Sequence, residues 1–219
     1  MIYKLQKIDE LTLADHYEID GTDNCFFICE YTSNVGYGYS DANQLISNLK
    51  KSVLKIGTSE YAHKIRAMQS VARLIASIKG IENYTIVPIP PSKIQEHREY
   101  DDRLLKILLD AKQINPNVQF CDLIHQESST RASHASTGNR LSKQELVNNF
   151  NSNEKNRNPI SGNVLIFDDL LTNGTHYKAA QQYLIENFPN ISVSGLFIAR
   201  RIFKNPFEDI TEDEDINFF

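Results

Sequence analysis

The stretch VLIFDDLLTNGTHY, residues 164–177, decides the fold class of this chain. Its four leading apolar residues are typical of a strand buried within a sheet. Asp168 and Asp169 follow where that strand is expected to end, and the polar turn TNGT at 172–175 leads into a helix with Tyr177 on its apolar stripe. A strand, a turn and a helix in this order indicate an α/β unit, and ligands of open parallel sheets bind at the carboxyl ends of the strands.

The same alternation extends in both directions from this stretch. The runs 25–31, 84–89 and 191–199 are apolar enough to be strands. Helical spacing follows Thr58, with an apolar stripe expected from five residues: Ile65, Met68, Ala72, Ile75 and Ile78. Further helices are expected after the N-cap candidate Ser40, from Tyr100, Leu104, Ile107 and their neighbours, from the capping box of Ser142 and Glu145, and after residue 175. We therefore expect an α/β fold with a Rossmann-like, mostly parallel sheet and helices on both faces.

A chain of 219 residues with 41% hydrophobic residues is long and apolar enough for one folded domain with an appendage. We expect an N-terminal α+β hood or appendage at residues 1–57, the main domain at 58–205, and an acidic tail at 206–219. Six acidic residues lie in the last twelve, so the rest of the chain is nearly neutral although the net charge is −5. Non-specific nucleic-acid binding is therefore not expected.

The first twenty residues carry charges throughout, which fits neither a signal peptide nor a membrane span, so we expect a cytoplasmic protein. Cys25 and Cys29 lie on the same side of a strand at this spacing, and Cys121 is far from both. Small buried hydrophobes are favoured over a metal or redox pair.

The turn after residue 171 has the chemistry of a phosphate cradle. Gly174 permits close backbone approach, Thr172 and Thr175 add hydroxyl donors, and the main-chain amides at Asn173 and its neighbours precede a helix N-terminus. Carboxylates repel phosphate but accept hydrogen bonds from hydroxyls. Asp168 and Asp169 are thus candidates to hold the two adjacent hydroxyls of a ribose whose 5′-phosphate lies in the turn, although capping the end of a strand is the simpler alternative.

The stretch 164–177 resembles, over about thirteen residues, the signature of the type I phosphoribosyltransferase superfamily, in which an acidic pair and a T-T-G loop bind phosphoribosyl pyrophosphate. Asn173 stands where threonine or serine is usual. The resemblance implies the type I phosphoribosyltransferase fold, with transfer or hydrolysis of the phosphoribosyl group. It also implies a Mg²⁺ cofactor held chiefly by ligand oxygens, with no direct metal ligand from the protein.

A second segment, IVPIPPSK at residues 86–93, followed by REYDDRLLKIL at 98–108, resembles the ComF-like branch of that superfamily. By this resemblance Pro91, Ser92 and Lys93 meet the pyrophosphate, with Arg98 nearby; an ion pair of Arg98 with Asp101 or Asp102 is the alternative. Lys93, Asp168 and Asp169 are then the catalytic candidates.

The polar stretch 129–142 resembles the flexible lid of the same branch, which makes Arg131, His134 and Arg140 lid candidates. The acceptor is unknown; in this superfamily a variable hood selects it, here expected at residues 1–57. Two other functions stay open: a non-catalytic sensor of phosphoribosyl pyrophosphate or another ribose 5-phosphate nucleotide that controls a protein partner, and an effector of a retron-like phage-defence system.

Overall fold

The computed structural model describes residues 4–130, 141–152, 160 and 162–204. Its main sheet has the strand order β1-β2-β8-β7-β3-β4, and every neighbouring pair except β1 and β2 is parallel. The strands are β1 (Gln6–Lys7), β2 (Cys25–Ser33), β3 (Thr85–Pro88), β4 (Gln119–Phe120), β7 (Gly162–Leu171) and β8 (Ile191–Phe203). The expected α/β class with a mostly parallel sheet is confirmed.

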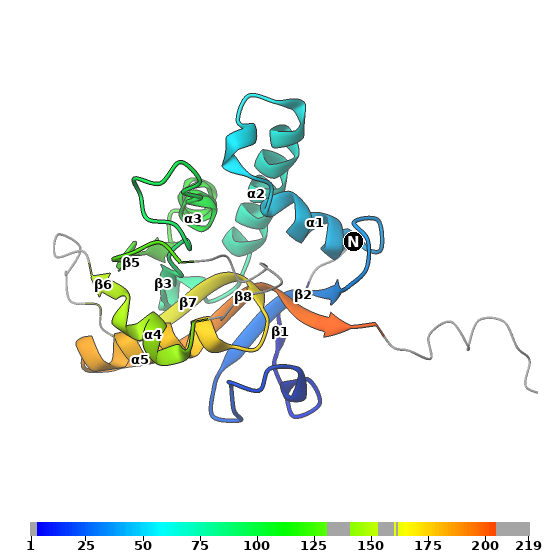
Figure 1. The fold of residues 1–219 in the computed structure, drawn as a ribbon. Helices are drawn as coiled ribbons and strands as arrows, with labels where there is room; N and C mark the ends of the chain where they lie inside the picture. The colour runs from blue at the N-terminus through cyan, green and yellow to red at the C-terminus, as the bar shows by residue number, and fades with distance from the viewer. Residues whose placement is uncertain (1–3, 131–140, 153–159, 161, 205–219) are drawn as a thin grey trace, which may run out of the picture.

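Helices cover both faces of this sheet, as predicted (Figure 1). One face carries α1 (Asp41–Leu49), α2 (Ser59–Ala76) and α3 (Arg103–Ile114), and the other carries α4 (Lys143–Asn148) and α5 (Thr175–Asn187). The described part of the chain also contains the short 3₁₀ helices η1 (Leu13–Asp15), η2 (Val53–Lys55) and η3 (Ile81–Asn83). A separate antiparallel hairpin pairs β5 (Ile124–Gln126) with β6 (Phe150–Ser152).

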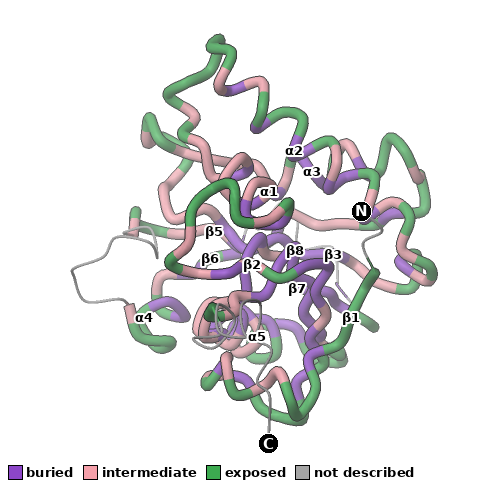
Figure 2. Tube along the Cα trace, turned by 90° about the vertical axis from the view of Figure 1, so that its right-hand side faces the viewer, coloured by how far each residue is buried: buried purple, intermediate pink, exposed green. Residues whose placement is uncertain are grey.

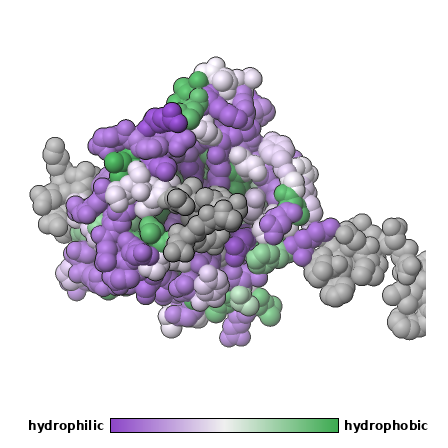
Figure 3. Space-filling model, viewed as in Figure 1, coloured by the Kyte–Doolittle hydropathy of each residue, from purple (hydrophilic) through white to green (hydrophobic). Residues whose placement is uncertain are grey.

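The central strands form the core (Figure 2). Residues 164–167 of β7 are buried on both faces because helices cover both sides of the sheet. Cys25 and Cys29 are buried and free, as expected, and burial raises the pKa of each thiol to about 12. The described residues on the face seen in Figure 3 are mostly hydrophilic, with hydrophobic side chains in small separate groups.

Side chains cap three of the helices where the sequence predicts it. Ser40 and Thr58 accept hydrogen bonds from the amides of Asn43 and Tyr61, and Ser142 forms a complete capping box with Glu145. These contacts satisfy amide groups that the first turn of a helix leaves without partners.

The inner stripe of α2 differs from the prediction at two positions. Ile65 is exposed and Ile78 lies beyond the end of the helix, so their expected places on the stripe are wrong. Lys64 turns inward instead and is only 1% exposed. Its ammonium donates to Asp101 and to the carbonyl oxygen of Lys51, so the burial of this charge is compensated.

The sheet extends across the boundary expected at residue 57. β2 lies between β1 and β8 and pairs with β8 from Cys25 to Ser33. This part of the expected hood is therefore built into the main sheet. No helix in the described part of the chain is long and apolar enough to cross a membrane.

Candidate functional site

β7 extends beyond the end of its neighbour β3. Pro88, the last residue of β3, lies opposite Phe167, whereas β7 stays paired with β8 as far as Leu171. The expectation that the strand ends before the aspartates is wrong, because the long strand β8 continues to supply hydrogen-bond partners. Asp168 and Asp169 lie on a stretch of β7 with a neighbour strand on one side, at the carboxyl edge of the parallel sheet.

Asp169 is held by two cations. Its Oδ2 atom accepts from the Nε and Nη2 atoms of Arg103 at 3.0 and 2.5 Å, and its Oδ1 atom lies 3.3 Å from the Nζ atom of Lys50. Burial opposes ionisation of this carboxyl, but the charges of Lys50 and Arg103 outweigh it and lower its pKa. Asp169 is therefore a charged anchor, only 4% exposed.

The same arginine continues the network away from the sheet. Its Nη1 atom donates to Asp101 at 2.7 Å, and the buried Lys64 ammonium donates to the same carboxylate oxygen at 2.6 Å. Burial lowers the pKa of Lys64, while Asp101 opposes that shift. Sequence reasoning gave no role to Lys50, Lys64 or Arg103 because their partners lie far away along the chain.

The pKa of Asp168 is shifted in the opposite direction to that of Asp169. Its Oδ1 atom accepts from the amide of Asp169 at 2.7 Å, and its side chain is half-buried. Burial and then the negative charge of Asp169 raise the pKa of Asp168 to about 7. Near neutral pH this carboxyl is divided between the acid and the carboxylate, so it can donate or accept a hydrogen bond.

A segment near the N-terminus packs against the turn 172–175. The amide of Glu18 donates to the carbonyl oxygen of Asn173 at 2.9 Å, and the Nδ1 atom of the fully buried His16 contacts the carbonyl oxygen of Thr172. Gly174 has φ of +97°, and a Cβ atom there would lie 2.8 Å from the Cγ2 atom of Ile19. The absence of a side chain at Gly174 therefore allows Ile19 to pack closely against the turn.

These contacts also orient the amides of the turn. In a trans peptide the N–H points away from the carbonyl of the same peptide unit. Since the Thr172 and Asn173 carbonyls face the 16–18 segment, the amides of Asn173 and Gly174 point away from it. The side chain of Asn173 bonds the amide and hydroxyl of Thr175, at 3.3 and 2.6 Å.

A pocket of about 130 Å³, here called the edge pocket, lies at the carboxyl ends of β3 and β7. It brings together six of the predicted residues: Pro91, Ser92, Lys93, Asp168, Asp169 and Thr172. Among the residues that sequence reasoning missed, its lining includes Lys50, Tyr100, Arg103 and Asp122. Asn173, Gly174 and Thr175 are in the adjoining turn but do not line the pocket.

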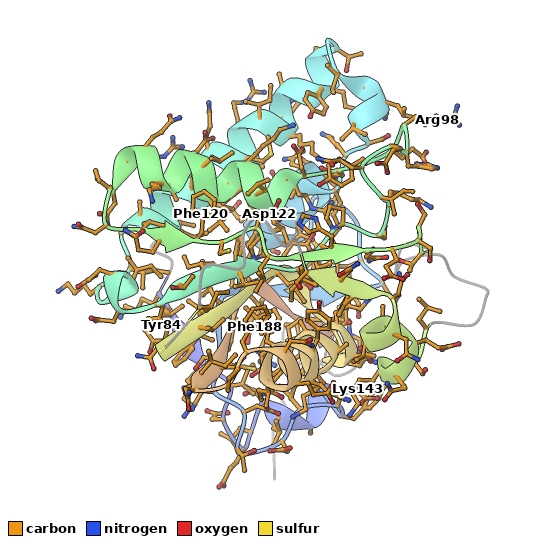
Figure 4. All side chains as sticks on the ribbon, turned by 90° about the vertical axis from the view of Figure 1, so that its left-hand side faces the viewer. Tyr84, Arg98, Phe120, Asp122, Lys143 and Phe188 are labelled. Carbon is orange, nitrogen blue, oxygen red and sulfur yellow. The ribbon has the colours of Figure 1, made fainter. Side chains whose placement is uncertain are left out.

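Arg98 is not brought to this pocket. It is exposed and points outward from the connection between β3 and α3, away from Asp122 (Figure 4). Its alternative partners are paired elsewhere, Asp101 with Arg103 and Asp102 with Lys106. Lys93 lines the pocket and donates to the carbonyl oxygen of Thr130 at 3.2 Å. The lid candidates Arg131, His134 and Arg140 lie outside the described residues.

The described lining of the edge pocket is rich in acids. Six carboxyl side chains face three cationic ones, Lys50, Lys93 and Arg103. Two of these acids, Asp101 and Asp169, are in ion pairs with Arg103. Within the described ranges, no three His, Cys, Asp or Glu side chains converge to hold a metal ion.

A comparison of the chain with protein-family models and with curated protein sequences finds no match.

Proposed function

We propose that this chain is a cytoplasmic phosphoribosyltransferase of the type I fold that binds phosphoribosyl pyrophosphate at the edge pocket. One observation supports the proposal above the others. The titratable carboxyl of Asp168 lines the edge pocket at the carboxyl edge of a parallel sheet, and the amides of Asn173 and Gly174 belong to the turn that adjoins it. That edge is where such sheets bind phosphorylated ligands.

The roles of the two aspartates differ in this proposal. Asp168 accepts hydrogen bonds from the ribose hydroxyls, while Asp169 positions Arg103 and Lys50 at 2.5 and 3.3 Å. Lys93 contacts the pyrophosphate that leaves the anomeric carbon, and Pro91 and Ser92 line its site. Cationic donors aimed at a leaving group stabilise the charge that develops on it.

The donors fit a magnesium ion that arrives with the ligand. Carboxylates outnumber cations in the lining, which favours a ligand whose negative charge is already reduced by a divalent ion. Bound Mg²⁺ would supply further neutralisation of the pyrophosphate charge. Asp168 is the described carboxylate best placed to accept from the hydroxyls that share this ion.

Calorimetric titration with phosphoribosyl pyrophosphate and Mg²⁺ tests the proposal, with Asp168→Asn as the variant. We expect the wild type to bind and Asp168→Asn to bind at least tenfold more weakly, with an unchanged thermal unfolding midpoint. Lys143→Gln, an exposed change on α4, is the control. Equal affinity in the wild type and Asp168→Asn contradicts the assigned ribose contact.

A non-catalytic sensor is the second candidate. The excess of acids around Lys93 favours it, because three described cations give little support to a departing pyrophosphate. Pyrophosphate release measured with a panel of nucleobases separates the two functions. Turnover supports the transferase, whereas Mg²⁺-dependent binding with no release supports the sensor.

A further inference from the structure

A short segment near the N-terminus, residues 15–23 and here called the docking segment, packs on one side of the turn 172–175. Three of its residues contact the three turn residues 172–174 in sequence order: His16 contacts Thr172, Glu18 contacts Asn173, and Ile19 lies against Gly174. The first of these pairs is 156 positions apart in the chain. A distant part of the sequence therefore shapes the turn.

His16 is fully buried in this contact. Its Nδ1 atom contacts the carbonyl oxygen of Thr172. Because a carbonyl oxygen can only accept a hydrogen bond, this contact assigns the hydrogen to Nδ1 and leaves Nε2 as the basic nitrogen of the neutral ring. Among the described residues, Nε2 has no hydrogen-bond partner. The neutral ring thus donates to the turn while its second nitrogen stays buried and unpaired.

A proton on Nε2 would create a buried positive charge and a second donor with no acceptor. The charged groups that act on the ring are Asp15 on η1 and two arginines on β8, Arg200 and Arg201. The carboxylate of Asp15 is already paired with Arg200 at 3.0 Å. Burial, and to a smaller extent the two arginines, lowers the pKa of His16, while the contact with Thr172 and the charge of Asp15 oppose this shift.

Protonation therefore opposes docking. When the segment is released, His16 is exposed and titrates near its ordinary value of about 6.5. The docked state, in which the pKa of His16 is lowered, binds fewer protons than the released state. Docking is fully favoured above about pH 6.5 and weakens as the pH falls below that value.

We propose that His16 is a positioning residue of the ligand site at the turn 172–175 and makes the geometry of that site sensitive to pH. The neutral ring holds the docking segment on the turn, so that the amides of Asn173 and Gly174 point away from the segment and stay available to a phosphate. Protonation of Nε2 releases the segment, and these amides lose their fixed orientation. This inference rests on the proposed function, because it concerns the regulation of the same site.

Hydrogen exchange of the Glu18 amide in the full chain measures docking without any ligand. This amide donates to the carbonyl oxygen of Asn173 at 2.9 Å, so its protection factor reports the contact. We expect the protection factor in the wild type to fall by a factor of about three to ten between pH 7.5 and pH 5.5. The amide of Ile89 donates to the carbonyl oxygen of Phe167 within the sheet and should keep its protection factor.

Two substitutions separate the hydrogen bond from the titration. The side-chain amide of asparagine places a donor where Nδ1 of histidine lies, so His16→Asn should keep the protection factor of Glu18 within about threefold and lose its dependence on pH. His16→Leu removes the donor and should lower the protection factor by about tenfold at both pH values. His63→Asn, a matched change at an exposed histidine of α2, should behave as the wild type does.

Calorimetry with phosphoribosyl pyrophosphate and Mg²⁺ at pH 7.5 tests the link between docking and the ligand. We expect His16→Leu to bind about tenfold more weakly than the wild type and His16→Asn to bind within about twofold of it. Because His16→Asn keeps the contact with Thr172, the comparison of pH values stands even where His16→Leu fails to fold.

The outcomes separate this inference from the proposed function. A protection factor of Glu18 that is constant with pH in the wild type, or that falls equally in His16→Asn, overturns the role of His16. Equal affinity for phosphoribosyl pyrophosphate in the wild type and in His16→Leu overturns it as well. Failure of the wild type to bind phosphoribosyl pyrophosphate overturns the proposed function alone, and a loss of protection at low pH that is absent in His16→Asn then still supports control of the turn by His16.

Discussion

Asp168 and Asp169 are neighbours in sequence with different chemistry because successive strand residues point to opposite faces. Asp169 contacts Arg103 and Lys50 and stays charged. Asp168 experiences burial and the charge of Asp169, and its pKa rises to about 7. Asp169 thus stays ionised and holds the two cations, whereas the protonation state of Asp168 changes near neutral pH.

Removing the charge of Asp169 is expected to destabilise the fold. Asp169→Asn leaves the guanidinium of Arg103 with one carboxylate partner in a largely buried site, which costs about 3 kcal/mol of unfolding free energy by analogy with broken buried ion pairs. Urea denaturation measures this loss. The double variant Asp169→Asn with Arg103→Leu should recover part of it, and a purely additive double variant contradicts the pairing.

Binding of phosphoribosyl pyrophosphate is expected to strengthen as pH rises from 6 to 8. A carboxyl with a raised pKa of about 7 becomes charged over this range, and the carboxylate is the better acceptor for hydroxyls. The charged groups acting on it are Asp169, which raises its pKa, and Lys50 and Arg103, which lower it. Calorimetry at each pH should show that the affinity for phosphoribosyl pyrophosphate depends more steeply on pH in the wild type than in Asp168→Asn, which lacks the titrating group.

At the scale of elements, the turn between β7 and α5 is shaped by a segment from the other end of the chain. Besides the contacts of His16 and Glu18, the ammonium of Lys178 on α5 lies 2.9 Å from the buried carboxylate of Asp23. The side-chain amide of Gln181 donates to the same carboxylate at 3.0 Å. The geometry of the turn 172–175 thus depends on docking of residues 16–23.

Alanine substitutions at two glycines distinguish the cost of backbone strain from the cost of a steric clash. Gly162 and Gly174 both have positive φ, +78° and +97°, but a Cβ atom at Gly162 meets nothing within 4 Å. Gly162→Ala is expected to cost about 1 kcal/mol from backbone strain alone. Gly174→Ala adds the 2.8 Å contact with Ile19 and should therefore lower the stability of the fold more than Gly162→Ala does. Thermal unfolding measures both losses. Equal losses contradict the close approach of Ile19.

Local chemistry made much of the fold predictable. Continuous apolar runs predict β3, β7 and β8, and the hydroxyls of Ser40, Thr58 and Ser142 predict three helix starts. These signals act over a few residues, so they can be read from the chain directly. The same signals do not show where β7 ends, because that depends on the length of its partner β8.

The site was predictable in part for the same reason. Asp168 lies near the end of β7, and Thr172 and Lys93 follow β7 and β3. The carboxyl ends of parallel strands meet at one edge of a sheet. The partners of Asp169 come from the end of α1 and the start of α3, far apart in sequence. No local pattern distinguishes such an anchor from a ligand-binding acid, and the docking of residues 16–19 was missed likewise.

At the scale of the whole molecule, the position of β2 predicts that residues 58–205 do not fold alone. Without β2, the apolar edge of β8 would lose its neighbour along nine residues of β2. We expect a 58–205 fragment to show poor dispersion of its amide NMR signals and the full chain to show good dispersion. Adding residues 1–57 as a separate peptide should improve the dispersion of the fragment's amide signals. Well-dispersed signals from the fragment by itself contradict the prediction.

The pairing of β2 with β8 also orders events during synthesis. Residues 25–33 leave the ribosome long before residues 191–203 exist, and among the described residues the other strand beside β2 is the two-residue strand β1. Contacts so distant in sequence form late and slowly. The nascent chain therefore carries an exposed apolar strand for most of its translation, and chaperones that bind extended hydrophobic segments would meet it there first.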